Sequence, residues 1–184
     1  MTRREAQVAS QRIYTGRVVK LDVDQVRFPD GSIGELEILR HPGASAILPV
    51  LSDLDGPDPQ VLLLRQYRYA ADGEIYEIPA GRLEPGEAPV ACAIRELKEE
   101  TGCTAERIEP LVTLYTTPGF TDERIHLFVA TGITRGEAAR EADEFVEVVP
   151  MSFTRALEMV RDGQIQDAKT AVTLLYVAGF RAGL

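Results

Sequence analysis

The chain has 184 residues, with 20 lysines and arginines against 29 aspartates and glutamates, so its formal net charge is −9. This length is that of one domain, or of one domain with a small appendage, and 45% hydrophobic residues exclude a disordered chain. The acidic balance argues against nucleic acids and membranes as partners, because their anionic surfaces need broad neutralisation by basic side chains. If the protein binds a phosphate group, a few charges placed close to that group must therefore neutralise it.

The sequence also predicts a cytoplasmic location. The first 14 residues contain no apolar stretch long enough for a signal peptide, and the most apolar segment, 171–180, is far shorter than the roughly 20 residues of a membrane span. Cys92 and Cys103 are the two cysteines, and without an export signal we expect both to be buried thiols in a reducing compartment.

The N-terminal part is predicted to be a β extension. Residues 16–28 alternate apolar and polar side chains as a strand does, residues 34–40 form its return, and Pro29-Asp30-Gly31 supplies the turn. An isolated hairpin is marginally stable in water, so it must pack on the main domain or on a second subunit. We favour a dimer arm over residues 1–43, followed by a main domain over residues 44–184.

The main domain is predicted to mix strands and helices. A helix over residues 87–101 has apolar residues at helical spacing and ends at Gly102, and Ser152 is a plausible N-cap for another. The remaining expectations are strands at 46–51, 61–67, 75–79, 108–116, 124–130 and 145–149, and helices at 152–161 and from Asp167 or Ala168 to about 179. This order favours an α/β (α+β) fold in which helices sandwich a mixed sheet.

Three carboxylates converge on the helix predicted at 87–101. Glu96, Glu99 and Glu100 lie three and four residues apart, which places them on one face, where like charges repel one another. For an arbitrary run of acids the ordinary interpretation is a solvated helix face. The alternative is a site for Mg²⁺, which prefers a few carboxylate oxygens and keeps positions open for water and substrate phosphate.

The spacing around these acids decides between the two interpretations. Gly81, Glu87, Arg95-Glu96-Leu97, Glu99-Glu100 and Gly102-Cys103 follow the order and intervals of the Nudix box, and the segment 81–103 resembles it completely if Cys103 counts as the final apolar position. The match to a 23-residue pattern of this kind has negligible odds of arising by chance at ordinary residue frequencies.

The resemblance implies the Nudix hydrolase fold and a metal-dependent hydrolysis of a nucleoside diphosphate linked to another group, with Mg²⁺ or Mn²⁺ as cofactor. By this resemblance Glu96, Glu99 and Glu100 are the candidate metal ligands, Glu99 and Glu100 also being catalytic candidates. Ala80 is expected to add its backbone carbonyl. Arg95 is expected to orient the box carboxylates through salt bridges, with Glu87 as a partner.

Flanking segments resemble the ADP-ribose pyrophosphatase branch of that family. Pro118 stands sixteen residues after Gly102, the position that marks the branch, although Pro-Gly is by itself only a turn. The segments 64–68 and 76–81 are also similar to this branch. They make Arg68, Arg65 and Glu77 candidates for substrate binding, where a guanidinium suits diphosphate oxygens. For each arginine, a surface salt bridge is the alternative.

The same branch has an N-terminal β extension that exchanges across a homodimer and helps to bind adenine. Residues 1–43 fit that role, and Tyr14 and Phe28 are the aromatic candidates for stacking, with packing within the hairpin as the alternative. The general base is expected on a late loop, at Glu141 or Glu144, although a solvated acidic loop explains these residues equally well.

Taken together, the resemblances imply a hydrolase that converts ADP-ribose to AMP and ribose 5-phosphate. One alternative is hydrolysis of other nucleoside diphosphate sugars such as GDP-mannose. A second is a non-catalytic Nudix-like domain that senses a nucleotide sugar, and a third is an isoprenoid diphosphate isomerase. The isomerase needs an acid/base cysteine, and Cys92 is predicted on or near the apolar face of the box helix, the wrong place for that role.

Overall fold

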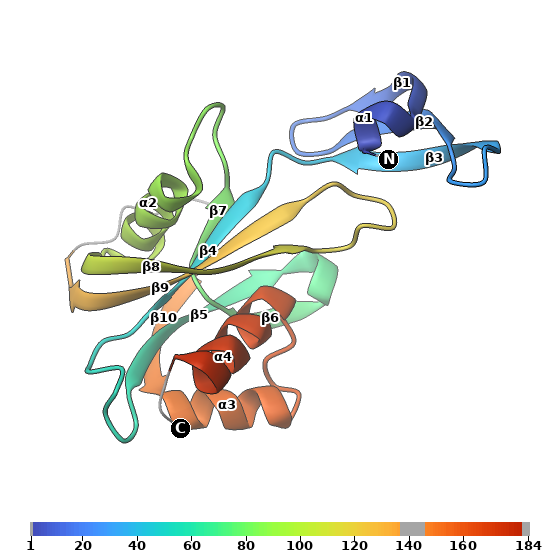
Figure 1. Cartoon of the computed structure of the whole chain (residues 1–184). Coiled ribbons are helices and arrows are strands. Elements are labelled where there is room, and N and C mark those ends of the chain that lie inside the picture. The colour runs from blue at the N-terminus through green and yellow to red at the C-terminus, as the bar shows by residue number, and fades with distance from the viewer. Residues whose placement is uncertain (1, 137–145, 182–184) are drawn as a thin grey trace. The chain divides into compact units, whose positions relative to one another are not determined.

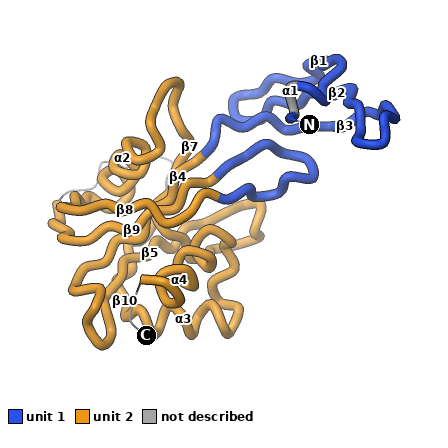
Figure 2. Tube along the Cα trace, in the orientation of Figure 1, with its two compact units in different colours: residues 1–43, 114–124 blue, residues 44–113, 125–184 orange. Residues whose placement is uncertain are grey.

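The computed structural model describes residues 2–136 and 146–181, so the candidate bases Glu141 and Glu144 lie outside the described residues. The chain divides into two compact units, coloured separately in Figure 2. The first unit comprises residues 1–43 and 114–124, and the second comprises residues 44–113 and 125–184. The first unit thus includes residues 114–124 from the predicted main domain.

The first unit contains a three-stranded antiparallel sheet in the order β1-β2-β3. Its elements are α1 (Arg3–Ala6), β1 (Gln7–Thr15), β2 (Lys20–Arg27) and β3 (Ile33–Arg40). The turn predicted between β2 and β3 is present, and Gly31 adopts a φ of 86° there while its N–H donates to the carbonyl of Phe28. The strand predicted at 16–28 begins later, at Lys20, as β2. The strand β1 was not predicted, because nearly all of its side chains are exposed and polar residues interrupt the alternation of apolar ones.

A buried ionic network holds the first unit together. Asp22 and Asp24 on β2 are only 6% and 3% exposed, and both contact the guanidinium of Arg40 on β3. Arg12 on β1 also contacts Asp22. Nη1 of Arg40 lies 3.5 Å from Asp122 in the segment 114–124, so one side chain connects β2, β3 and that segment.

Backbone hydrogen bonds join the segment 114–124 to β3. The Leu39 N–H donates to the carbonyl of Phe120 at 2.8 Å, and the Leu39 carbonyl accepts from the N–H of Asp122 at 3.3 Å. The His41 N–H donates to the Asp122 carboxylate at 2.8 Å. These bonds explain why a segment so distant in sequence belongs to the first unit.

The second unit contains two sheets, one of four strands in the order β7-β4-β9-β8 and one of three in the order β10-β5-β6. Their strands are β4 (Ala44–Pro49), β5 (Gln60–Arg68), β6 (Gly73–Glu77), β7 (Ala80–Arg82), β8 (Thr104–Tyr115), β9 (Arg124–Thr134) and β10 (Val146–Ser152). The four-stranded sheet is mixed, because β4 runs antiparallel to β7 and parallel to β9. All six residues of β4 are buried, as expected for a central strand covered on both faces.

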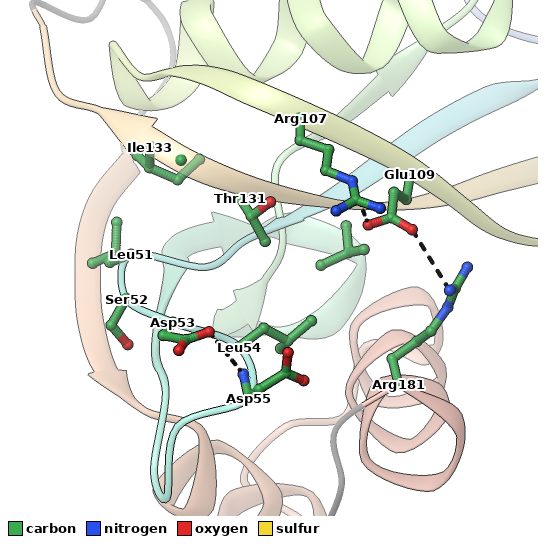
Figure 3. A pocket seen from close by; sticks show the side chains of 12 residues that line it. Leu51, Ser52, Asp53, Leu54, Asp55, Arg107, Glu109, Thr131, Ile133 and Arg181 are labelled. Atoms are coloured by element: carbon green, nitrogen blue, oxygen red, sulfur yellow. Dashed lines mark hydrogen bonds and ion pairs between the residues drawn. The ribbon is translucent and has the colours of Figure 1, made fainter.

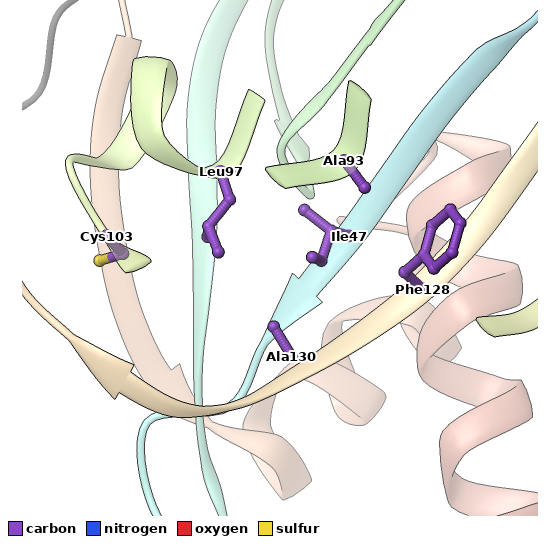
Figure 4. Close-up of a cluster of buried hydrophobic side chains, with 6 residues drawn as sticks. All are labelled: Ile47, Ala93, Leu97, Cys103, Phe128 and Ala130. Atoms are coloured by element: carbon purple, nitrogen blue, oxygen red, sulfur yellow. The ribbon is translucent and has the colours of Figure 1, made fainter. Parts of the chain in front are cut away.

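Helices lie on both sides of the strands of the second unit (Figure 1). They are α2 (Pro89–Thr101), α3 (Phe153–Arg161) and α4 (Ala168–Phe180), and a short 3₁₀ turn, η1 (Tyr69–Ala71), joins β5 to β6. A core cluster beneath α2 joins this helix to β4 and β9, as Figure 4 shows; it contains Ile47, Ala93, Leu97, Cys103, Phe128 and Ala130. The predicted α/β fold with a mixed sheet between helices is confirmed. Among the described residues, no helix is long and apolar enough to cross a membrane.

Candidate active site

The helix α2 begins and ends for identifiable reasons. Pro89 occupies its first turn, where a missing N–H costs no helical hydrogen bond and the fixed φ favours the helix. Gly102 closes it in the left-handed conformation, with a φ of 72°, and donates its N–H to the carbonyl of Lys98. The helix therefore fixes the positions of Arg95 and of the three glutamates that follow.

Arg95 is the centre of a charged cluster. Its Nε and Nη2 donate to the two carboxylate oxygens of Glu87 at 3.0 and 3.1 Å, and its Nη1 donates to Glu96 at 2.6 Å and to Glu99 at 3.0 Å. A further bond reaches the carbonyl of Arg82 at 3.1 Å. The hydrogen bonds from Arg95 lower the pKa of Glu87 to about 2, so this carboxylate is ionised at neutral pH.

Glu96 and Glu100 also contact the backbone of β7, the strand that precedes α2. A Cβ atom on Gly81 would lie 1.7 Å from Oε1 of Glu96, so only glycine allows this carboxylate to approach the backbone of β7. Glu100 is 5% exposed, and its Oε2 accepts the N–H of Ala80 at 2.9 Å. The predicted role of Ala80 concerns its carbonyl, whereas the structure records a bond from its N–H.

The donor chemistry of this cluster fits a hard divalent cation. Glu96, Glu99 and Glu100 supply carboxylate oxygens from one helical face, next to the backbone of Ala80. In residues 2–136 and 146–181, however, no three carboxylate, histidine or cysteine side chains are gathered as a metal cage. Glu96 and Glu99 also share the guanidinium of Arg95, whose single charge offsets part of their negative charge.

A second charged group lies on β5, β6 and the start of α4. Nε and Nη2 of Arg68 donate to the two oxygens of Glu77 at 2.6 and 3.2 Å. Glu77 is 3% exposed and also contacts Lys169. Burial by itself raises the pKa of Glu77, but the hydrogen bonds and charges of Arg68 and Lys169 outweigh it and hold the pKa below its ordinary value. Sequence reasoning missed Lys169, because 92 residues separate it from Glu77.

Arg65 is engaged elsewhere. It lies three positions before Arg68 on β5, so the two side chains leave opposite faces of the strand. Arg65 contacts Glu147 on β10 and lies 3.6 Å from Glu74 on β6. The structure thus brings Arg68 and Glu77 together and places Arg65 in a surface ion pair, the alternative left open by the sequence.

The remaining candidates belong to the first unit. Tyr14 is the last residue but one of β1 and packs over Gly16, and Phe28 follows β2 and packs over Gly34. A Cβ added to either glycine would lie 2.7 Å from the ring. Pro118 helps to line a cavity of about 200 Å³ together with Asp24, Val26, Leu36, Ile38, Arg40, Tyr115, Thr121 and Asp122. Their substrate-binding roles stay predictions.

A larger cavity of about 580 Å³ in the second unit contains none of the predicted site residues (Figure 3). Two of its arginines, Arg107 and Arg181, lie 3.0 and 3.5 Å from the carboxylate of Glu109 between them. Its wall includes Leu51, Ser52, Asp53, Leu54, Asp55, Val129, Thr131, Gly132 and Ile133.

Comparison with known proteins decides the family. A model of the NUDIX domain matches residues 40–171, which include every residue of the charged cluster on α2. The chain belongs to the Nudix family. It is a Nudix hydrolase similar to ADP-ribose pyrophosphatases, and the family resemblance of the box is thereby confirmed.

Two relatives resemble nearly the whole of this Nudix hydrolase. A "Methanol dehydrogenase activator" of Bacillus methanolicus is 41% identical over 175 residues, and an "ADP-ribose pyrophosphatase" of Bacillus subtilis (strain 168) is 40% identical over the same length. Each alignment covers 94% of this chain and 92% of the relative. A solved structure described as an ADP compounds hydrolase superimposes with a TM-score of 0.79 over 95% of this chain and 92% of its own, and at 20% identity it supports the fold alone.

The geometry of this Nudix hydrolase also bears on the isomerase alternative. The Cys92 thiol is fully buried in α2, and burial raises its pKa to about 11. It lies within hydrogen-bonding distance of the carbonyls of Gly81 and Arg82. A buried thiol with so high a pKa is protonated at neutral pH and does not exchange protons with a substrate.

Proposed function

We propose that this protein hydrolyses ADP-ribose to AMP and ribose 5-phosphate. The observation that carries the proposal is the similarity to an ADP-ribose pyrophosphatase, which extends over 94% of the chain and so beyond the family model at residues 40–171. The extra matched length includes sequence of the first unit, where the substrate-specific features of the branch are expected. The intact box carboxylates support turnover rather than sensing.

In the proposed reaction a water oxygen attacks one phosphorus of the diphosphate, and the bond to the bridging oxygen breaks. One phosphate leaves with adenosine as AMP, the other leaves with the ribose, and the water proton passes to a base. The guanidinium of Arg68, anchored through Nε and Nη2 on Glu77, presents its remaining N–H groups to the anionic substrate. Its charge offsets the repulsion between the substrate and a protein of net charge −9.

The box carboxylates provide the second part of the site. Glu96, Glu99 and Glu100 would hold a divalent ion, with the backbone at Ala80 beside them. When bound, Mg²⁺ or Mn²⁺ supplies charge neutralisation of the diphosphate and a more acidic water. Arg95 holds Glu96 and Glu99 through ion pairs, and Gly81 leaves room for the carboxylate of Glu96.

Three finer assignments remain proposals. Glu141 or Glu144 takes the water proton. The first unit forms a homodimer with a second copy and contributes Tyr14 or Phe28 to the adenine, while Pro118 shapes the same subsite. In support of an interface, ten of sixteen large apolar side chains found exposed in the described part of the chain belong to the first unit, namely Val8, Ile13, Tyr14, Val18, Val19, Phe28, Ile33, Leu36, Tyr115 and Phe120.

The test of the proposed function compares hydrolysis of ADP-ribose, GDP-mannose and a nucleoside triphosphate at one Mg²⁺ concentration. We expect the highest kcat/KM for ADP-ribose. A preference for GDP-mannose would favour the nucleotide-sugar alternative, and a preference for the triphosphate would overturn the branch assignment. Binding of ADP-ribose without turnover of any of the three would indicate a sensor.

The companion test is Glu100→Gln, which keeps the size of the side chain and its ability to accept the Ala80 N–H. We expect turnover to fall by about two orders of magnitude or more, because a metal-binding carboxylate is lost. The circular dichroism spectrum should be unchanged. Glu158→Gln on the exposed side of α3 is the matched control, and it should retain full activity. Full activity of Glu100→Gln would contradict the assignment.

A further inference from the structure

The start of α4 supplies a cation to the group that contains Arg68. Lys169 is the second residue of this helix, and its Nζ contacts Oε2 of Glu77 and lies 2.8 Å from Oδ1 of Asp167. The Lys169 side chain is 15% exposed and that of Glu77 is 4% exposed, so the contact is largely shielded from water. Within such a shielded group an ion pair is screened little by solvent or salt.

The position of Lys169 is fixed by the fold. Asp167 caps the helix by accepting the N–H of Thr170 at 2.9 Å and its hydroxyl at 2.6 Å. The hydroxyl oxygen of Thr170 in turn accepts the N–H of Ile78 at 2.8 Å. The residue that follows Glu77 is therefore bonded to the residue that follows Lys169, so the two charged side chains are brought together by backbone geometry.

The Glu77 carboxylate is shared by two cations, so it does not cancel the positive charge of Arg68 by itself. Glu77 is a single anion between two cations, Arg68 and Lys169, while Asp167 lies at the positive end of α4 and accepts two cap hydrogen bonds. Without Lys169, Arg68 would be the one cation among the described residues in contact with the buried Glu77 carboxylate, and that carboxylate would cancel its charge. With Lys169, two cations face the two carboxylates of the group, Glu77 and Asp167, so Glu77 is not compensated by Arg68 alone.

The geometry of Arg68 agrees with this division. Its Nε and Nη2 face Glu77, and in residues 2–136 and 146–181 Nη1 has no hydrogen-bond partner. The Arg68 side chain is 44% exposed even though its Glu77 partner is buried. One edge of the guanidinium is thus held by the protein and the other is accessible to a ligand.

We propose that Lys169 is a positioning residue for the substrate diphosphate, because it compensates Glu77 and so leaves the charge and the outer edge of Arg68 for the phosphate oxygens. The inference rests on the proposed function, in which Arg68 contacts the diphosphate. Lys169 itself does not touch the substrate. Its effect must therefore disappear when Arg68 is absent.

The experiment is a double-mutant cycle with Lys169→Met and Arg68→Met in the full chain. We expect Lys169→Met to raise KM for ADP-ribose about tenfold with a smaller change in kcat, the range for a charged hydrogen bond. In the Arg68→Met background the same change should alter KM by less than about twofold. Equal effects of Lys169→Met in both backgrounds, or an unchanged KM in the single variant, would overturn the proposal.

Two further variants separate positioning from structure. Lys169→Arg keeps the cation and should restore KM to within about threefold of the wild type, whereas loss as large as that of Lys169→Met would count against a charge effect. Arg161→Met removes an exposed arginine at the end of α3 and should leave KM unchanged. If Lys169→Met does not fold, Glu77→Gln with Lys169→Met removes both buried charges. No carboxylate of this pair then cancels the charge of Arg68, so KM should stay within about threefold of the wild type, and a rise of about tenfold would overturn the proposal.

A second readout does not depend on turnover. The Kd of ADP-ribose, measured by calorimetry with divalent metals removed, should follow the same cycle. If the wild type binds ADP-ribose but hydrolyses GDP-mannose better, the proposed substrate is wrong, and the cycle on GDP-mannose still tests Lys169. If the effects of the two substitutions are additive on the substrate that the wild type hydrolyses, the positioning role of Lys169 is rejected and the proposed function is not affected.

Discussion

Two residues of the box, Arg95 and Gly81, allow the carboxylates of α2 to lie close together and close to the backbone of β7. Glu96, Glu99 and Glu100 would repel one another on one helical face, and Arg95 reduces this repulsion through ion pairs with Glu96 and Glu99. Gly81 is as important as any charged residue, because the carboxylate of Glu96 occupies the space in which a Cβ would lie. Glycine is therefore required at position 81 because a Cβ would clash with the Glu96 carboxylate, and not because of its backbone conformation.

Gly81→Ala is expected to displace the Glu96 carboxylate and lower kcat by about tenfold or more, since a misplaced ligand weakens both metal binding and substrate positioning. Steady-state kinetics over a series of Mg²⁺ concentrations measures the effect. The control is Gly179→Ala in α4, where nothing lies within 4 Å of the added Cβ and alanine favours the helix. Wild-type kinetics for Gly81→Ala would contradict the close packing described above.

The charged residues of the site differ in how far the sequence could reveal them. The contacts of Arg95 were predictable because its partners lie within the same box, where sequence spacing along the helix indicates which side chains are neighbours. The contact of Lys169 was not, because its partner Glu77 is on a strand distant in sequence and no local pattern indicates the pairing. Arg65 and Arg68 looked equivalent in sequence, and only strand alternation separates their surroundings.

At the scale of elements, end signals and alternation predicted most helices and buried strands. Ser152 and Asp167 cap α3 and α4 as their positions suggested, and β4 and β5 are the apolar runs expected of covered strands. The strand β1 escaped prediction because its stability comes from pairing with β2 and from the ion pair between Arg12 and Asp22, and not from an apolar face.

Ser152→Ala should lower the free energy of unfolding by about 1 kcal/mol, because the hydroxyl accepts the N–H of Arg155 at 3.2 Å at the start of α3. Urea denaturation measures the loss, and Ser152→Thr should recover most of it by restoring a capping oxygen. The kcat/KM for ADP-ribose should not change. Equal stability of the alanine variant and the wild type would show that the cap contributes nothing.

The ionic network of the first unit makes its stability depend on acid pH. The hydrogen bonds from Arg12 and Arg40 lower the pKa of Asp22 to about 2, from its ordinary value of 3.8. A carboxylate whose pKa is lower in the folded state stabilises the fold above the unfolded pKa, and that contribution is lost as the pH falls from about 4 to 2. Asp22→Asn should therefore be less stable than the wild type at pH 7.

The deficit of Asp22→Asn should shrink between pH 4 and pH 2, as measured by urea denaturation at each pH. Glu35→Gln is the control, because Glu35 is an exposed residue of β3 without an ion pair in the described part of the chain. Its stability relative to the wild type should show no such convergence. A deficit of Asp22→Asn that stays constant down to pH 2 would contradict the role given to the ion pairs.

At the scale of the whole molecule, the expected homodimer depends on the exposed apolar side chains of the first unit. Ile13 is 52% exposed on β1, and Ile13→Glu would place a charge in the proposed interface. Light scattering after size exclusion should give about twice the 20.2 kDa chain mass for the wild type and a shift toward the single-chain mass for Ile13→Glu. Gln11→Glu adds the same charge at a polar position of β1 and should remain dimeric. A monomeric wild type would reject the dimer.

The path of the chain through its two units limits how this enzyme can be recombined. The polypeptide passes from one unit to the other at residues 43–44, 113–114 and 124–125, and Leu39 bonds to Phe120 and Asp122 within the first unit. Grafting residues 1–43 onto another hydrolase would leave the backbone groups of Leu39 without these partners. A functional chimaera must therefore exchange the two segments jointly, and gene fusions or deletions that treat the N-terminal portion as a detachable module should yield poorly folded products.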